Sequence, residues 1–398
     1  MDKVSKTGEV MIEIKKKEQC CGCSAYEQIC PKQCITMRVD EEGFLYPVVE
    51  KNKCVNCGMC EKVCPILNVS KKRSGEPLCY AAYNNNEEER LNSSSGGIFC
   101  LLARRIIEEG GIVFGAAMSD DCKKVHHIAV SELEDIEKLQ GSKYVQSEIG
   151  STYKQAREAL EDGVKVLFSG TPCEIEGLKA YLQKDYEKLV CVDVVCHGSP
   201  SPKLWGNYVR FRERHAGATA CRTFFRHKKH GWKKYEVLFK FTNNTSYEQI
   251  LYKDLFMQMF LQNLCLRPSC YACSFKKENR ESDITLADFW GCGNICPDLD
   301  DDKGLSMILI HSENGKGIFD SIKANMCFRE VPIQAALKGN IAVTESCKKP
   351  PNREQFMTAI DAMEFDILGK RYLKKASFKE RLRRAMPEKF KMKIRNWL

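Results

Sequence analysis

The sequence predicts three parts in a chain of 398 residues: an α+β module, an α/β domain and a basic helical tail. Two cysteine runs lie before residue 65, strand and helix patterns alternate through the middle of the chain, and Lys and Arg dominate its end. Strands that alternate with helices are typical of βαβ units around a parallel or mixed sheet. We therefore expect the module at 1–70, a linker at 71–77, the α/β domain at 78–345 and the tail at 346–398.

The second cysteine run, CVNCGMCEKVCP, has the spacing of a bacterial iron-sulfur ligand run. In two-cluster ferredoxins the fourth Cys of each run binds the other cluster, and here that residue is Cys64, followed by Pro65. The module is therefore predicted to be a two-cluster ferredoxin-type domain. Its complete 4Fe-4S site is expected to be made by Cys30, Cys54, Cys57 and Cys60.

The first run, CCGCSAYEQICPKQC, has Tyr26 where the third ligand belongs. A phenolate is a harder and less acidic ligand than a thiolate, so it suits an iron-sulfur cluster poorly. Three outcomes stay open: Cys21 or Cys34 replaces the missing ligand, the cluster is labile or of the 3Fe-4S type, or it is absent. A zinc module is the alternative, but crossed runs with both prolines favour clusters. The cluster site that lacks this ligand, which we call the second site, keeps Cys20, Cys23 and Cys64.

The 23 cysteines indicate an intracellular metal-binding protein. No apolar run approaches the ~20 residues of a membrane span, and the N-terminus lacks the apolar core of a secretion signal. Cysteines at this density in such a chain are more typical of metal ligands than of disulfides. We therefore expect a cytoplasmic protein, and heavy use of free thiols suggests an anaerobe.

The positive charge of the chain lies in its tail. The formal net charge is +9, and residues 370–398 hold twelve Lys and Arg against two Glu, a net +10. The rest is nearly neutral, so the composition does not indicate a nucleic-acid partner. A basic amphipathic tail fits an anionic membrane surface, and a helix docked on the body or on a partner is the alternative. Its two apolar stripes are Phe378, Leu382 and Met386, and then Phe390, Ile394, Trp397 and Leu398.

Helix and strand patterns follow one another between residues 95 and 241. Periodicity and end signals predict helices at 95–111, 153–163, 171–183 and 201–215, and strands at 111–118, 164–170 and 188–195. Segments 223–228 and 235–241 are predicted to form a hairpin.

Four cysteines of this domain could form a third metal site. Cys173 follows one predicted strand and Cys196 follows the next, so both are expected at one edge of the sheet. They could join Cys270 and Cys273 around a cluster. A zinc ribbon made by Cys270, Cys273, Cys292 and Cys296 is the alternative that spacing leaves open.

Two short Gly and Ser segments could bind phosphate. LNSSSGG and GSKYVQS lie beside predicted helices, and their free N–H groups, with Lys143, suit a pyrophosphate. A plain turn or helix cap is the alternative for each segment. The chain contains neither a G-x-G-x-x-G fingerprint nor a Walker lysine motif.

Five segments, in order, carry a family resemblance: SSSGG, GSKYVQS, GTPCEIEGL, CHGSPSP, and LRPSCYACSFK with RESDITLADFWG. They resemble the beta subunits of coenzyme F-420-reducing hydrogenases and dehydrogenases, in the bacterial form with an N-terminal ferredoxin module. The resemblance covers roughly residues 10 to 345. It implies an iron-sulfur flavoprotein with FAD in the α/β domain and two to three 4Fe-4S clusters in the chain.

The resemblance also implies roles for residues of the α/β domain. Cys173, Cys196, Cys270 and Cys273 become the ligands of the domain cluster. His197 and Asp193, beside that cluster, become candidates for proton delivery. The implied FAD contacts are Ser95, Gly96, Gly97, Gly141, Ser142, Lys143, Tyr144, Thr171 and Pro172.

The expected function is an oxidoreductase that passes electrons between a ferredoxin or other redox partner and an organic small-molecule substrate or coenzyme. The N-terminal module and basic tail resemble bacterial members of the family that are found with cell-surface polysaccharide genes. The family also includes proteins that do not use the deazaflavin coenzyme, so the resemblance leaves the acceptor open. The alternatives are a non-catalytic electron-transfer subunit and a zinc-stabilised binding protein at the membrane.

Overall fold

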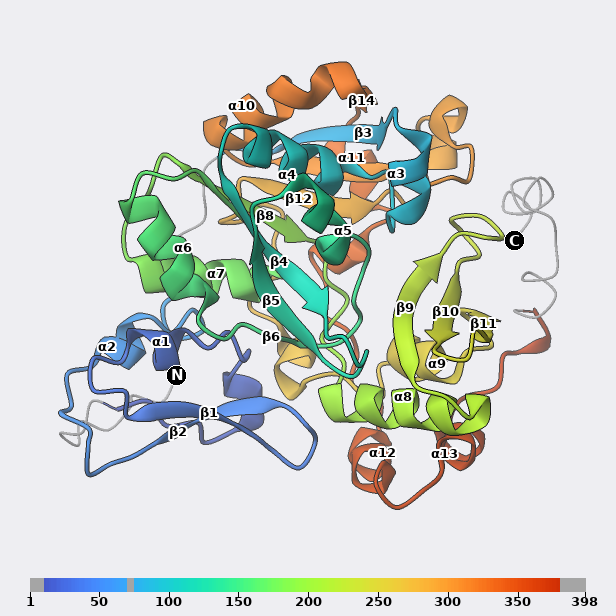
Figure 1. Ribbon diagram of the computed structural model, residues 1–398, viewed down its shortest axis with the longest axis horizontal. Helices are drawn as coiled ribbons and strands as arrows, with labels where there is room; N and C mark the ends of the chain where they lie inside the picture. Colours follow the sequence, from blue (N-terminus) through green and yellow to red (C-terminus); the bar gives the residue numbers. More distant parts are fainter. Residues whose placement is uncertain (1–10, 70–74, 380–398) are drawn as a thin grey trace.

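The computed structural model describes residues 11–69 and 75–379 (Figure 1). A nine-stranded mixed sheet lies at the centre of these residues, which confirms the predicted mixed α/β fold. Its strands lie in the order β14 (Met326–Glu330), β3 (Leu78–Asn84), β13 (Ser306–Ile310), β12 (Ile284–Asp288), β8 (Leu189–Val194), β7 (Val166–Gly170), β4 (Ile112–Met118), β5 (Val125–Val130) and β6 (Ser147–Glu148).

The middle of this sheet is parallel. Strands β12, β8, β7 and β4 are joined by parallel pairings. Strands β13, β3 and β14 extend one side by antiparallel pairings, and β5 pairs antiparallel with β4 on the other side. Because parallel strands end at a common edge, the residues after β7 and β8 lie together there, at the place where α/β sheets bind ligands.

The four helices predicted from periodicity are present as α4 (Ile98–Glu108), α6 (Thr152–Glu161), α7 (Pro172–Leu182) and α8 (Pro202–Ala216). Helix α7 begins with a capping box between Thr171 and Glu174 and has Pro172 in its first turn, as helix starts favour. The other helices of this domain are α3 (Glu87–Asn92), α5 (Ile136–Leu139), α10 (Glu313–Ile322) and α11 (Ile333–Leu337).

The two faces of the sheet have separate cores. Leu167 and Val190 pack toward α4 and α10, whereas their neighbours Val166 and Phe168 pack toward α6 and α7. This alternation is the period of two that a strand imposes on its side chains. Both faces are therefore covered, and the parallel strands are mostly apolar.

A second, smaller sheet lies beside the nine-stranded one. The predicted hairpin is confirmed as β9 (Ala220–His227) and β10 (Glu236–Phe241), and β11 (Ser246–Ile250) completes the sheet. These strands share a core rich in aromatic rings with α8 and α9 (Leu255–Leu261). In Figure 1 this unit stands apart from the larger sheet, above α8.

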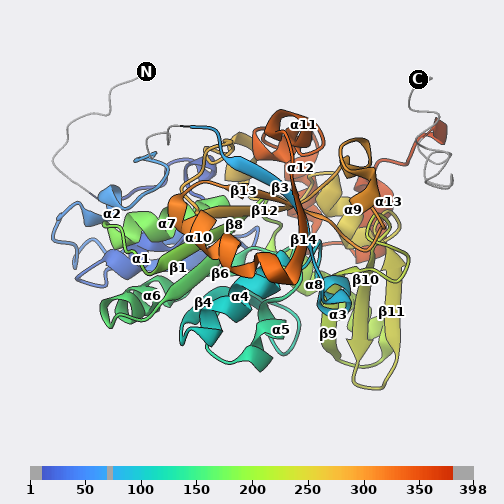
Figure 2. The same ribbon diagram turned by 90° about the horizontal axis from the view of Figure 1, so that it is seen from above.

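The N-terminal segment packs against the face of the large sheet that α6 and α7 cover, as Figures 1 and 2 show. It contains α1 (Ala25–Ile29), the antiparallel strands β1 (Ile35–Val39) and β2 (Leu45–Val49), and α2 (Met59–Lys62). Its cysteines belong to the same core as α7, so this segment and the domain share one apolar interior.

Part of the predicted tail is folded onto the body. Helices α12 (Arg353–Ala359) and α13 (Phe365–Tyr372) bury Phe356, Phe365 and Leu368 in the core around α8. Phe378 is 81% exposed. The remaining members of the two predicted stripes, Leu382, Met386, Phe390, Ile394, Trp397 and Leu398, lie outside the described residues.

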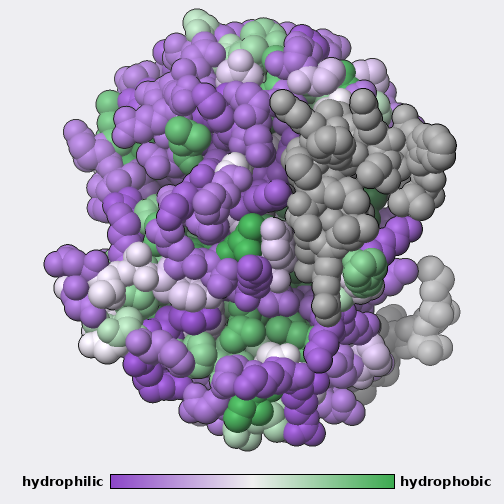
Figure 3. Space-filling view, turned by 90° about the vertical axis from the view of Figure 1, so that its right-hand side faces the viewer, coloured by the Kyte–Doolittle hydropathy of each residue, from purple (hydrophilic) through white to green (hydrophobic). Residues whose placement is uncertain are grey.

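Within 11–69 and 75–379, no helix is both long enough and apolar enough to cross a bilayer. The face shown in Figure 3 is mostly hydrophilic, with hydrophobic side chains gathered in smaller patches.

Candidate functional site

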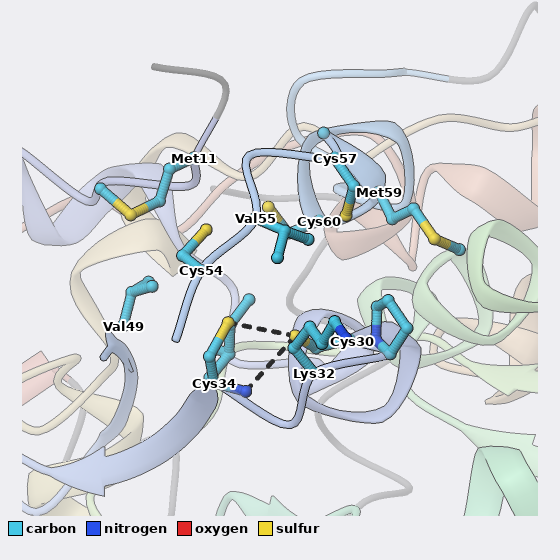
Figure 4. A pocket seen from close by; sticks show the side chains of 13 residues that line it. Met11, Cys30, Lys32, Cys34, Val49, Cys54, Val55, Cys57, Met59 and Cys60 are labelled. Atoms are coloured by element: carbon cyan, nitrogen blue, oxygen red, sulfur yellow. Dashed lines mark hydrogen bonds between the residues drawn. The ribbon is translucent and has the colours of Figure 1, made fainter. Parts of the chain in front are cut away.

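Five cysteines of the N-terminal segment surround one pocket, which we call the outer thiol site: Cys30, Cys34, Cys54, Cys57 and Cys60. Their sulfur atoms face a common space in Figure 4. Four of them are the residues that the crossed pairing assigns to the complete cluster. Cys57 is exposed, so this site opens to the surface.

Cys34 is the unexpected member of the outer thiol site. Its Sγ lies 3.3 Å from the Sγ of Cys30, and its backbone N–H donates to the same sulfur. The hypothesis that Cys34 replaces the missing ligand of the second site is therefore wrong for this structure. Cys34 follows a tight turn after Pro31 and enters β1, which carries it to the Cys30 side.

The second set of ligands forms a fully enclosed group, which we call the inner thiol site: Cys20, Cys23 and Cys64, with Tyr26. The Tyr26 hydroxyl lies 3.3 Å from the Cys64 Sγ, and its side chain is 0% exposed. Burial, followed by the neighbouring thiols, raises the pKa of the Tyr26 phenol far above its ordinary value. The residue is thus a neutral phenol in the place of a thiolate ligand.

Cys21 connects the inner thiol site with the domain. Its thiol is hydrogen-bonded to the thiols of both Cys173 and Cys23. Close packing holds this arrangement, because a Cβ added to Gly177 of α7 would lie 3.0 Å from the Cys23 Sγ. The two cysteine groups therefore meet without an intervening layer of apolar side chains.

The structure brings together four predicted cysteines of the domain, which we call the body thiol site: Cys173, Cys196, Cys270 and Cys273. Burial, with the neighbouring thiols, raises the pKa of Cys196 well above its ordinary value and that of Cys270 to about 12. A hydrogen bond with Cys21 and then burial raise the pKa of Cys173. Each thiol of this group interacts electrostatically with the other three.

The alternative zinc set is divided in the structure. Cys292 and Cys296 pack in the core around β3 and β13, whereas Cys270 and Cys273 face Cys173 and Cys196. Among the described residues, no three His, Cys, Asp or Glu side chains converge on a point that would hold a single metal ion. A cluster needs a wider arrangement, because each of its irons takes its own thiolate. The donor set of each site, soft thiols in groups of three to five, fits iron-sulfur chemistry.

Arg267 joins the N-terminal segment to the loop that carries Cys270. It is 1% exposed and donates to the Cys20 carbonyl at 2.8 Å, the Leu45 carbonyl at 2.9 Å and Gln146 Oε1 at 3.0 Å. Gln146 in turn donates to the Cys21 carbonyl at 3.2 Å. Arg267 therefore fixes the inner and body thiol sites relative to each other. The sequence motif LRPSC contains this Arg, but nothing in its pattern indicates the partner.

A cavity of about 300 Å³ opens at the carboxyl ends of β7 and β8. This volume is in the range of small-molecule and cofactor sites. Cys196 of the body thiol site and His197 line its wall. Seven of the nine predicted FAD contacts line it as well: Ser95, Gly97, Gly141, Ser142, Lys143, Tyr144 and Thr171.

Gly96 and Pro172 are the two predicted contacts that do not line the cavity. A Cβ on Gly96 would lie 2.4 Å from the Ala82 carbonyl oxygen, so this glycine packs against β3. Its N–H donates to Ser306 Oγ at 2.9 Å. Pro172 is buried in the first turn of α7. Both residues shape the loops that line the cavity.

The cavity wall suits a phosphate-bearing cofactor at one end. Gly97, whose φ is +81°, is the N-cap of α4 and provides no side-chain cap, and the first residues of α4, Ile98 to Cys100, line the cavity. Uncapped N–H groups at a helix start favour an anion. Lys143 also lines this wall, and burial lowers its pKa to about 7. Valines of β8 and its following loop, with Phe260, give the remainder an apolar character.

The two candidate residues for proton delivery differ in position. His197 lines the cavity, and its Nε2 is 2.7 Å from Asn263 Oδ1, so Nε2 donates and Nδ1 is the basic nitrogen of the neutral ring. Burial lowers the pKa of His197. Asp193 is 1% exposed, pairs with Arg280 at 3.1 Å and does not line the cavity. Its position is that of a structural ion pair.

Sequence reasoning did not identify Asp288 at the cavity wall, although the DFWG segment contains it. Asp288 accepts from Trp232 Nε1 at 2.8 Å and pairs with Arg226. Arg226 also donates to the Tyr144 hydroxyl at 3.3 Å. A polar residue that ends a strand at this edge of the sheet is the signal that could have indicated it.

Glu174 is a second cavity residue that the sequence did not single out. Its Oε2 accepts from the Thr171 N–H at 2.7 Å and lies 4.0 Å from His127 Nε2. His127 donates from Nε2 to the Ser169 carbonyl at 3.0 Å, and burial lowers the pKa of its ring. Both side chains are buried behind the loop that follows β7.

Comparison with known proteins places part of this domain in a family. Residues 163–336 match the family described as the C terminus of the coenzyme F420 hydrogenase/dehydrogenase beta subunit. No curated protein matches the chain. A chain of the F420-reducing [NiFe] hydrogenase complex from Methanosarcina barkeri, solved in a xenon-derivatization study, is similar at 19% identity with a TM-score of 0.45, over 76% of this chain and 94% of that chain.

The matched range begins before β7 and ends in α11, so it contains all four cysteines of the body thiol site. It leaves the N-terminal thiol sites and the SSSGG and GSKYVQS segments outside the match. The family resemblance predicted from the sequence is thus confirmed over 163–336, where the chain matches the model of the C terminus of the coenzyme F420 hydrogenase/dehydrogenase beta subunit.

Proposed function

We propose that the protein is an iron-sulfur flavoprotein oxidoreductase that passes electrons between a ferredoxin-type donor and an organic substrate or coenzyme. The observation that carries the proposal is the position of Cys196. This residue belongs to the body thiol site and also lines the cavity. A cluster held by the body thiol site would therefore lie at the wall of the cofactor cavity.

The three thiol sites form a continuous series from the surface to this cavity. The outer thiol site is exposed at Cys57, and the inner one is buried. Cys21 connects the inner site to Cys173 of the body site, and Cys196 reaches the cavity. Such a series is what electron transfer between a protein partner and a buried cofactor requires.

We propose FAD as the cofactor of the cavity. The start of α4, with Gly141 and Lys143, would hold its pyrophosphate, because the uncapped N–H groups of α4 line the cavity together with a Lys side chain. The Lys143 ammonium donates to the Lys138 and Gln140 carbonyls in this structure and would turn toward the phosphate. FAD supplies hydride and single-electron chemistry when it is bound. We propose that His197 holds or delivers a proton at Nδ1, since its Nε2 is bonded to Asn263.

The surface around Cys57 suits an acidic electron donor. Lys32, Lys51 and Lys62 are exposed around the outer thiol site, and Val55 is 55% exposed next to them. Positive charge around an apolar contact favours association with a negatively charged partner. An acidic ferredoxin is therefore the proposed donor, and the substrate, including any role in polysaccharide biosynthesis, stays a prediction.

The test is reduction of bound flavin by chemically reduced ferredoxin under anaerobic conditions. We expect rapid bleaching in the wild type and in Cys327→Ser, a control thiol of β14 that does not line the cavity. Cys196→Ser should retain flavin but lose most of this reduction. Equal rates in both variants would contradict the proposed path. Turnover by the isolated chain with an added acceptor then separates an enzyme from a non-catalytic electron-transfer subunit.

A further inference from the structure

The inner thiol site is complete without a fourth cysteine. We propose that it holds a three-iron cluster on Cys20, Cys23 and Cys64, with Tyr26 occupying the corner where a fourth iron would need its ligand. This inference rests on the proposed iron-sulfur function and deepens it. It assigns to this chain a cluster type that the spacing of its two cysteine runs leaves open.

Tyr26 lies at the third ligand position of the first cysteine run. It belongs to α1, as the third ligand position of the run does, and its side chain is 0% exposed. Its hydroxyl contacts the Cys64 Sγ at 3.3 Å. The ring therefore lies beside the three thiols, and neither it nor any of them is exposed.

Neither of the two neighbouring cysteines, Cys34 and Cys21, takes the place of Tyr26. The Cys34 thiol lies 3.3 Å from Cys30 at the outer thiol site. The Cys21 thiol interacts with Cys173 of the body thiol site as well as with Cys23, so we infer that it bridges the two sites and does not take the place of Tyr26. Gly22, between Cys21 and Cys23, has a φ of +78° and lies so close to Gln146 and Arg267 that a Cβ would clash. The loop is thus held in a shape that directs Cys21 toward the domain.

Three thiols and a phenol favour a cluster of three irons. A cubane takes one thiolate for each of its irons, and a neutral phenol is a poor ligand for a soft iron-sulfur corner. Three thiols then retain three irons. With a cluster bound, the Tyr26 hydroxyl would donate a hydrogen bond to the Cys64 thiolate, and hydrogen bonds to ligand sulfurs are among the factors that set cluster potentials.

The test uses electron paramagnetic resonance, because the two cluster types differ in electron parity. An oxidised three-iron cluster contains three ferric ions and has an odd number of unpaired electrons, whereas a resting four-iron cluster has an even number and is silent. We expect the anaerobically purified wild type to give a signal without reductant and to contain about eleven irons, from sites of about four, three and four.

Tyr26→Cys should lose the resting signal and gain about one iron per chain. Unchanged iron and signal in this variant would overturn the inference, as would a wild type that is silent with four irons at every site. If Tyr26→Cys does not fold, Tyr26→Phe serves instead, because it removes only the hydroxyl. It should keep the signal and shift the reduction potential of the inner cluster, and loss of the signal would contradict the inference.

Cys21→Ser and Cys34→Ser are the matched controls. Both should keep the resting signal, since neither thiol is a ligand of the inner site. If the Cys21→Ser variant lost the resting signal or gave a different one, Cys21 would be the fourth ligand, and the assignment would be refuted. A wild type without any iron would instead refute the proposed function, so the two failures are distinguishable.

Discussion

The outer and inner thiol sites come from two copies of one cysteine run, yet they differ in exposure and in ligands. The outer site has five thiols and an exposed Cys57, whereas the inner site has three thiols, Tyr26 and no exposed member. The difference follows from packing, because the inner site lies against α7 and the outer one against solvent. One repeat is thus exposed at the surface, where we propose that a partner docks, and the other is buried against the domain.

The largest expected effect is removal of the outer cluster alone. The triple variant with Cys54→Ser, Cys57→Ser and Cys60→Ser should lose about four irons, because the two thiols that remain at the outer site are too few to hold a cluster. It should keep the resting paramagnetic signal of the inner site. Iron analysis with spectroscopy on the same sample measures both. Cys34→Ser is the matched control and should keep all the iron. Loss of the inner signal in the triple variant would show that the two sites are not independent.

The second prediction concerns a variant of Arg267, which links the inner thiol site to the domain. Arg267→Met removes three hydrogen bonds and leaves the Cys20 and Leu45 carbonyls unsatisfied in a buried place. We expect unfolding free energy to fall by about 3 kcal/mol or more, since each buried unsatisfied group costs about 1–3 kcal/mol. Denaturant unfolding measures this loss. Arg38→Met, an exposed change in β1, should have little effect, and equal effects would contradict the docking role.

The third prediction extends the comparison to the cavity. Lys143→Met should weaken FAD binding by about 10- to 100-fold, because hydrogen bonds to charged groups contribute about 1.5–3 kcal/mol. Lys138→Met, an exposed neighbour, is the control. Burial lowers the Lys143 pKa to about 7, so its charge and the FAD affinity should both fall as pH rises through 7. A pH dependence that persists in Lys143→Met would assign it to another group.

The smallest expected effect concerns the surface of the outer thiol site. Reversing charge with Lys51→Glu and Lys62→Glu should slow reduction by an acidic ferredoxin by about tenfold at low salt, because charge mainly changes association rates. Lys338→Glu, on the surface after α11, should not. Stopped-flow rates across a salt series measure the effect. If slowing is equal in all three variants, the surface around Cys57 is not the docking site.

Sequence reasoning predicted the alternating helices and strands well, because periodicity reports burial directly. It also grouped the outer cysteines, since spacing within a short loop limits where thiols can lie. It did not predict the antiparallel strands β13, β3 and β14, because alternation does not specify a partner strand. The contacts of Arg267 with Cys20 and of Arg226 with Asp288 join residues far apart in the chain, and no local pattern indicates them.

The central claim is that the three thiol sites and the cavity hold clusters and a flavin in one chain. Anaerobic purification followed by measurement of iron, zinc and flavin on the same sample tests it most directly. We expect about eleven irons and one FAD per chain, with no stoichiometric zinc. Zinc in place of iron, with no flavin, would contradict the account and indicate a zinc-stabilised binding protein.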